Sequence, residues 1–167
     1  MSSRKPAGAG RFYPADGATL AKDVRKYLAA GGPATIRTAC VVPHAGYMFS
    51  GSTAGRTLAR VAMPATIIIL SPNHTGAGAG IAVWTAGTWG TPLGEVAIDE
   101  VAAAAIAGLA GAAGDTAAHR SEHSIEVMLP FLQTIRADVR IVPVTIMTHD
   151  LAVLVKFGRE LAGFVRG

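Results

Sequence analysis

The sequence carries one short pattern twice: an apolar run, then a proline, then a histidine within two residues of that proline. Residues 36–42 precede Pro43 and His44, and residues 66–70 precede Pro72 and His74. In a parallel sheet, the carboxyl ends of the strands border the crevice where ligands bind. Two imidazoles placed there would supply half of a metal site or an acid–base pair. We therefore take His44 and His74 as candidate metal ligands and expect them at the same edge of adjacent strands.

Polar residues beside these histidines are candidates for substrate binding. Tyr47 follows the first histidine closely, and Asn73 directly precedes the second. An aromatic residue such as Tyr47 is also typical of a core or a pocket wall.

The glycine-rich loop at 76–80 lacks the lysine and the spacing of a phosphate-binding loop, so its glycines indicate close backbone approach or mobility.

A third cluster of chemical groups lies at residues 119–126. His119 and His123 are four residues apart, but an acid stands beside the second histidine, so the cluster is not the H-E-x-x-H pattern of zinc proteases. Glu122 or Glu126 is placed to orient an imidazole. The alternative is structural: a helix start capped by Ser121 or His123. A structural role is favoured for His119, whereas His123 and Glu122 are the candidate catalytic residues.

The composition excludes several classes of protein. Half of the 167 residues are hydrophobic and 16% are charged, as in a folded domain of one core. The net charge of +4 is spread along the chain rather than gathered into a nucleic-acid patch. No apolar run reaches the ~20 residues of a membrane span, and no secretory signal begins the sequence. We expect a cytoplasmic protein without nucleic-acid or membrane partners, with its single cysteine, Cys40, buried.

Hydrophobic periodicity predicts alternating strands and helices. Because such alternation is typical of an α/β fold, we expect one domain over residues 1–167 with a mainly parallel sheet flanked by helices. Pro130 must start, kink or divide the helix in which it lies. The predicted strands are 36–42, 66–70, 81–84, 95–98 and 139–146, and the predicted helices are 16–30, 52–61, 99–109, 124–136 and 150–165.

Five motifs in this order resemble those of the Memo family, whose bacterial and archaeal members are called AmmeMemoRadiSam system protein B. They are spread over nearly the whole sequence. The motifs are Pro6-Ala7-x-Ala9-Gly10-x-Phe12-Tyr13-Pro14, Val42-Pro43-His44-Ala45-Gly46-Tyr47-x-x-Ser50-Gly51, Leu70-Ser71-Pro72-Asn73-His74-Thr75, Trp89-x-Thr91-Pro92-Leu93-Gly94 and Glu122-His123-Ser124-Ile125-Glu126-Val127-x-Leu129-Pro130-Phe131-Leu132.

The resemblance implies a fold like that of class III extradiol dioxygenases, with a site that can hold a metal. Two of the family's metal-ligand histidines fall on His44 and His74, and iron or copper is the implied metal. Family members extend further and carry a later cysteine as a third ligand, whereas this sequence stops at Gly167. It therefore resembles the N-terminal portion of the family's domain, with the third protein ligand missing.

Two functions remain open on this basis, and with them the question whether the protein is an enzyme. One is a metal-dependent redox protein of unknown substrate; the other is a non-catalytic module whose histidine-lined crevice binds a peptide or a protein. We expect an unpaired apolar sheet edge at strand 139–146 or a neighbour, which a second copy or a separately encoded C-terminal half would cover. The alternative is a monomer whose last helix, 150–165, folds over that edge.

Overall fold

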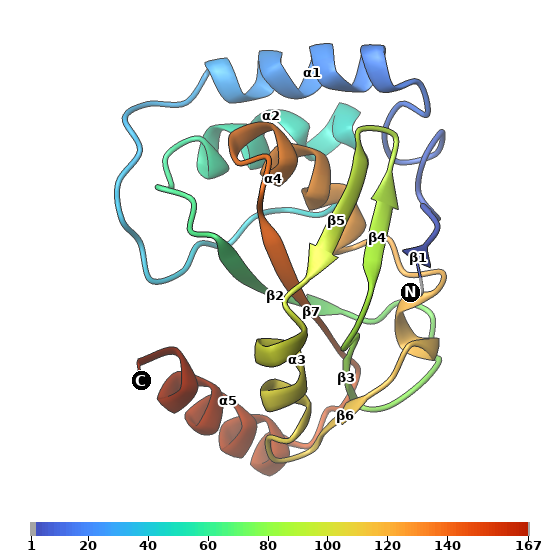
Figure 1. Cartoon of the computed structure of the whole chain (residues 1–167), viewed down its shortest axis with the longest axis vertical. Coiled ribbons are helices and arrows are strands. Elements are labelled where there is room, and N and C mark those ends of the chain that lie inside the picture. Colours follow the sequence, from blue (N-terminus) through green and yellow to red (C-terminus); the bar gives the residue numbers. More distant parts are fainter. Residues whose placement is uncertain (1–2, 167) are drawn as a thin grey trace.

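The computed structural model describes residues 3–166, which form a seven-stranded sheet with helices on both sides (Figure 1). Helices α1, α2 and α4 lie at the top of that view, and α3 and α5 lie at the bottom. The elements are β1 (Ser3–Arg4), α1 (Gly17–Ala29), α2 (Tyr47–Leu58), β2 (Thr66–Pro72), β3 (Ile81–Val83), β4 (Thr88–Thr91), β5 (Gly94–Ile98), α3 (Glu100–Ala107), β6 (Ala112–Gly114), two 3₁₀ turns (Ala117–His119 and Glu126–Met128), α4 (Leu129–Ile135), β7 (Arg140–Ile146) and α5 (Leu151–Arg166).

Strand β7 is the centre of the sheet. β2 pairs with it in parallel along its whole length, so β2 occupies one complete side of β7. The other side is shared, because β5 pairs with the start of β7 in parallel and β3 pairs with its end in antiparallel fashion. β6 extends the sheet beyond β3, and β4 and β1 extend it beyond β5. Four of these six pairings are parallel, which confirms the predicted α/β fold with a mainly parallel sheet.

Helices α1, α3 and α5 form where the sequence predicts them. Asp16 caps α1 by accepting a hydrogen bond of 2.8 Å from the Thr19 amide, and Asp99 caps α3 through the Ala102 amide. The apolar face of α1 is buried at Leu20 and Val24, and α1 packs against α2 and α4. Pro130 lies in the first turn of α4 and so divides the predicted helix 124–136 into a 3₁₀ turn and a short α-helix.

The predicted strand at 36–42 is wrong, because these residues form an irregular segment. Ile36 and Val41 are 90% and 95% exposed, and Cys40 is exposed as well, contrary to the prediction that it is buried. A strand exists only where another strand accepts its backbone hydrogen bonds, and within the described residues segment 36–42 pairs with no strand; the nearest bridge joins Thr35, just before the segment, to Val61. The local sequence favours a strand, but the partner is lacking.

Two further predictions need correction. The segment expected to be irregular at 85–94 contains β4, which forms a hairpin with β5 through Gly94 at a φ of 114°. Helix α2 begins at Tyr47 rather than at Ser52. For the apolar sheet edge the sequence left two alternatives, strand 139–146 or a neighbour: the strand at 139–146 is the central β7, and its neighbour β2 lies at an edge. Among the described residues, no helix is both long and apolar enough to cross a membrane.

A buried ion pair fastens the N-terminal segment to the rest of the fold. Arg4 is 3% exposed and Glu126 is fully buried, and their Nη1 and Oε2 atoms lie 2.6 Å apart. The Glu126 carboxylate also accepts hydrogen bonds of 2.8 Å from the amides of Ala7 and Gly8, and one from the Tyr13 hydroxyl. Burial and the hydrogen bond to Glu126 both raise the pKa of Tyr13, so its hydroxyl stays a donor.

The other donors of Arg4 bind the turn that leads to Glu126. Its Nε donates to the His119 carbonyl at 2.8 Å, and its Nη2 donates to the Glu122 carbonyl at 2.5 Å. The guanidinium lies 4.2 Å from the centre of the Trp89 ring. One buried arginine therefore sets the path of residues 119–126.

We expect Glu126→Ala to lower the free energy of unfolding by about 3–5 kcal/mol, because it leaves the charge of Arg4 buried without its partner. Chemical denaturation monitored by circular dichroism measures the change. Glu95→Ala is the control, since among residues 3–166 this exposed carboxylate bonds only Ser3 and Thr88 and its loss should cost less than about 1 kcal/mol. Equal stability of the two variants would contradict the role given to the ion pair.

Candidate metal centre

His74 lies two residues beyond the carboxyl end of β2, as the sequence predicts. The amide of Asn73 donates to the Ile146 carbonyl at 3.0 Å and so extends the pairing of β2 with β7 as far as the residue before His74. The side chain of His74 is 45% exposed. A rigid strand end therefore presents a half-exposed imidazole to solvent.

His44 lies near His74, but a helix start rather than a strand end positions it. No strand precedes it, so the prediction that both histidines follow adjacent strands is wrong for His44. Its position depends on the start of α2, where the Tyr47 amide donates to the Phe12 carbonyl and the Ser50 hydroxyl donates to the Ala45 carbonyl, both at 2.8 Å. The centres of the His44 and His74 rings lie 5.3 Å apart.

His123 completes a group of three imidazoles. Its ring centre is 4.9 Å from that of His74 and 6.2 Å from that of His44. On one face it stacks against Phe12, with ring centres 3.9 Å apart and an angle of 13° between the planes. Stacking restricts the rotation of the ring and shields one of its faces from water.

A buried carboxylate lies beneath these rings. Glu122 is 1% exposed and accepts four hydrogen bonds: from the amide of His74 at 2.5 Å, from the Nδ1 of His74 at 3.0 Å, and from the amides of His123 and Ser124 at 2.9 and 3.0 Å. Burial alone would raise its pKa, but the hydrogen bonds from His74 and Ser124 outweigh burial and lower the pKa of Glu122 to about 2. The group is therefore a carboxylate at neutral pH.

This carboxylate sets which nitrogen of His74 donates a hydrogen bond to it. A carboxylate only accepts hydrogen bonds, so the Nδ1 of His74 must be the protonated nitrogen that faces it. The Nδ1 of His123 lies 3.3 Å from the same Oε1 atom. His74 therefore has Nε2 as its nitrogen for a metal, which is the arrangement of metal-binding histidines that donate their other nitrogen to a carboxylate.

Burial keeps two of the rings neutral. It lowers the pKa of His44, and repulsion by His74 lowers it further, against the attraction of Glu122. Burial likewise lowers the pKa of His123, and the neighbouring Glu122 opposes this only in part. Neutral imidazole is the form that binds a metal ion.

The donor atoms fit a transition metal. Ligand atoms of His74, Glu122 and His123 all lie within 4.8 Å of one another, so one ion could contact all three. Imidazole nitrogens suit iron, copper and zinc. Glu122 accepts three of its four hydrogen bonds on Oε1, so that oxygen orients the residues around it, whereas Oε2 accepts only from the His74 amide and keeps a lone pair that could contact the ion.

The two residues predicted to bind substrate lie beside this group and also have structural contacts. Tyr47 is 5% exposed, and its hydroxyl donates to the Val127 carbonyl at 2.8 Å. Its ring also lines a surface pocket of about 480 Å³ together with Phe12 and Phe49. Asn73 organises the loop after β2, since its Oδ1 accepts from the Thr75 amide and hydroxyl. Their role in substrate binding stays a prediction.

The remaining residues of the third cluster are structural. His119 is fully buried, its Nε2 lies 3.1 Å from the Ala82 carbonyl, and the rings of Trp84 and Trp89 meet it edge-on. Glu126 binds the N-terminal segment and does not orient an imidazole. Phe12 was not predicted to be part of the site, although its position in the first of the five motifs was an available signal.

The fold and site define an α/β protein with three imidazoles and a buried carboxylate beyond the end of one strand. The sequence profile of the Memo-like protein family matches residues 4–167. The chain therefore belongs to the Memo-like family, which confirms the resemblance seen in its motifs.

Archaeal relatives support this assignment over nearly the whole chain. The chain is 48% identical to a MEMO1 family protein of Thermococcus onnurineus, 45% to one of Thermococcus kodakarensis and 44% to one of Methanopyrus kandleri, in each case over 95% of its length. It spans 58%, 58% and 61% of these relatives' own lengths. The relatives thus contain a further part that has no counterpart in this sequence.

The buried His119 should make the protein sensitive to mild acid. Burial lowers the pKa of His119 to about 4 from its ordinary 6.5, so the unfolded chain takes up a proton at a pH where the folded chain does not. Stability is therefore lost as the pH falls from about 6.5 to 4, by about 2–3 kcal/mol from this residue. Denaturation curves between pH 7 and 4 should show a shallower loss for His119→Gln than for wild type. Parallel losses would contradict this cause.

Proposed function

We propose that His44 and His74 bind one ion of iron or copper in this protein and that the bound metal serves a redox reaction. The observation that carries the proposal is the Glu122 carboxylate, which binds the Nδ1 of His74 and leaves its Nε2 as a ligand. A bound redox metal would supply one-electron chemistry. Membership of the Memo-like family is consistent with this function, and the substrate is not identified by it.

The neighbouring residues have separate parts in this proposal. His123 is a neutral imidazole held by Phe12, so it is suited to take up or release a proton near the metal. Glu122 orients His74 and His123 and balances part of the positive charge that a metal ion brings. Tyr47 and Asn73, beside the histidines, would contact the substrate.

We expect about one metal ion per chain after anaerobic loading with ferrous or copper ions. The double variant His44→Ala/His74→Ala should lose it, because both proposed ligands are gone. His149→Ala is the control, since this histidine is exposed before α5 and outside the cluster. Elemental analysis after gel filtration measures the stoichiometry. A wild-type chain without metal, or a double variant that retains it, would refute the proposed site.

Replacing His74 alone should separate binding from folding. His74→Ala removes a half-exposed ring on a loop, so the free energy of unfolding should change by less than about 1 kcal/mol. Metal affinity should fall at least tenfold. Mutation of a residue that only hydrogen-bonds a metal ligand already lowers metal affinity by about tenfold or more, and here the ligand itself is removed. Calorimetric titration and thermal denaturation give the two quantities. Reduced stability with unchanged affinity would count against a ligand role.

An exposed apolar surface favours a second function, that of a non-catalytic binding module. Met48 and Phe49, in the first turn of α2, are 84% and 81% exposed. Phe49 borders the pocket of about 480 Å³ that Arg11 and Phe12 also line. Such a surface suits an apolar or aromatic side chain of a peptide or partner protein. Absence of metal binding together with a bound peptide at this pocket would favour the module over the redox protein.

A further inference from the structure

Residues 36–42, which we call the arch, run beside helix α2 and are anchored near both ends of that helix. At one end the Thr35 amide donates to the Arg60 carbonyl at 3.0 Å, just beyond the end of α2. At the other end the Tyr47 amide, the first of α2, donates to the Phe12 carbonyl at 2.8 Å. Figure 1 shows this part of the chain as a wide loop between α1 and α2. The arch is therefore held at its ends, while within the described residues its middle pairs with no strand.

A pocket of about 460 Å³ lies between the arch and α2. Its volume is within the range of roughly 300–1,000 Å³ that is usual for small-molecule sites. Arg37 and Cys40 line it from the arch, Arg56 lines it from α2, and Arg60 lines it from the turn after that helix. The pocket thus has walls from two separate parts of the chain.

The pocket is strongly positive. Three of its eight lining residues are arginines, and none of the eight is an aspartate or a glutamate. Within residues 3–166 the side chains of Arg37, Arg56 and Arg60 form no ion pair, whereas the buried Arg4 pairs with Glu126. Each guanidinium has a permanent charge and five N–H donors in a fixed plane. Three such groups around one pocket repel one another, and an anion between them would remove that repulsion.

The chemistry of the lining favours a phosphate group attached to an organic molecule. A phosphate monoester has close to two negative charges and three terminal oxygens, so it can bind several guanidinium groups at once. The pocket is larger than a phosphate group alone requires. Ala39, Cys40 and Val61 add an apolar wall beside the arginines, which suits the uncharged part of such a molecule.

We propose that this pocket binds a small organic phosphate, with Arg37, Arg56 and Arg60 around the phosphate group and the apolar wall against the rest of the molecule. The ligand would join the arch to the helix, because its phosphate group would bind Arg37 of the arch and Arg56 of α2 together. None of the proposed metal ligands lines the pocket, so this site is separate from the candidate metal centre.

The test is calorimetric titration of the full chain, without added metal, with ADP and with a hexose phosphate. At least one of them should bind with one-to-one stoichiometry, and its Kd should rise with sodium chloride concentration, because salt screens the attraction between arginine and phosphate. Adenosine and glucose, the matched molecules without phosphate, should not bind. Absence of binding by both phosphates, or equal binding by the unphosphorylated molecules, would overturn the proposal. Tighter binding of a single-stranded oligonucleotide than of either phosphate would overturn the assignment to a small molecule.

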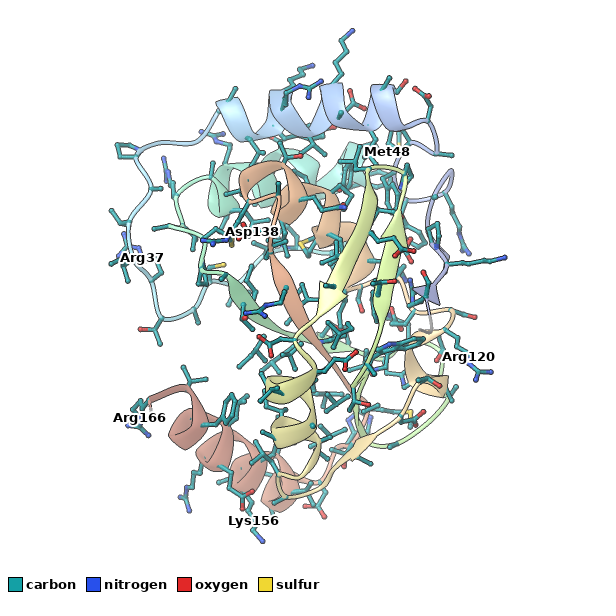
Figure 2. The ribbon with its side chains drawn as sticks, in the orientation of Figure 1. Arg37, Met48, Arg120, Asp138, Lys156 and Arg166 are labelled. Carbon is teal, nitrogen blue, oxygen red and sulfur yellow. The ribbon has the colours of Figure 1, made fainter. Side chains whose placement is uncertain are left out.

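Variants of the arginines locate the site. Arg56→Gln and Arg60→Gln should each raise the Kd of the bound phosphate at least tenfold, because each removes a charged donor. Both side chains are exposed, so the variants should fold, which circular dichroism checks. Arg120→Gln is the matched control, since Arg120 is also exposed and Figure 2 shows it on the opposite side of the molecule from Arg37. Equal affinity of all three variants would place the phosphate elsewhere and overturn the proposal.

Cys40 gives a second readout in the unmodified pocket. It is the only cysteine of the sequence and its side chain lines the pocket, so iodoacetamide reports on this one position. A saturating concentration of the bound phosphate should slow the alkylation severalfold, and the same concentration should protect less in Arg56→Gln. Mass spectrometry of the Cys40 peptide measures the rate. Unchanged reactivity would place the ligand outside the pocket and overturn the proposal. Neither readout depends on a bound metal, so this proposal and the metal-site proposal can fail separately.

Discussion

The buried pair of Arg4 and Glu126 is the interaction on which the rest of the site depends. A buried charge is tolerated only when its partner and its hydrogen bonds are complete, and here both ions meet that condition. The pair joins the first residues of the chain to a turn more than a hundred residues later. Arg4 donates a hydrogen bond to the Glu122 carbonyl and so positions Glu122. Glu126 accepts a hydrogen bond from the Gly8 amide and so positions the segment that carries Phe12, whose ring stacks on His123.

The imidazole cluster combines two opposing electrostatic effects. Burial and mutual repulsion lower the pKa of His44, which keeps that ring neutral, while Glu122 remains ionised because four donors stabilise its negative charge. The result is a set of neutral nitrogens above a fixed negative charge. That combination attracts a cation while leaving its ligands free of protons, which is what a metal site requires before the metal arrives.

The two proposed ligands are positioned by elements of different kinds. His74 follows β2, which pairs with β7 along its whole length. His44 follows segment 36–42, which pairs with no strand within the described residues, and it is placed instead by the start of α2, where the Tyr47 amide donates to the Phe12 carbonyl.

The sequence by itself determined the elements whose formation depends on local interactions. The capped helices, the apolar strands β2 and β7 and the α/β alternation were all predicted, because caps and periodic apolar residues act over a few neighbours. The motifs also identified the family. Local signals likewise predicted a strand at 36–42, and there they failed.

Only the tertiary structure decided which residues meet. Strand formation at 36–42, the edge position of β2 and the central position of β7 depend on partners distant in sequence, and no local pattern specifies them. The same holds for the pairing of Arg4 with Glu126 and for the stacking of Phe12 on His123. Histidines at 44, 74 and 123 were all visible in the sequence. The carboxylate that contacts His74 and His123 could be seen only once the chain had folded, because Glu122 acts through contacts with a residue 48 positions away.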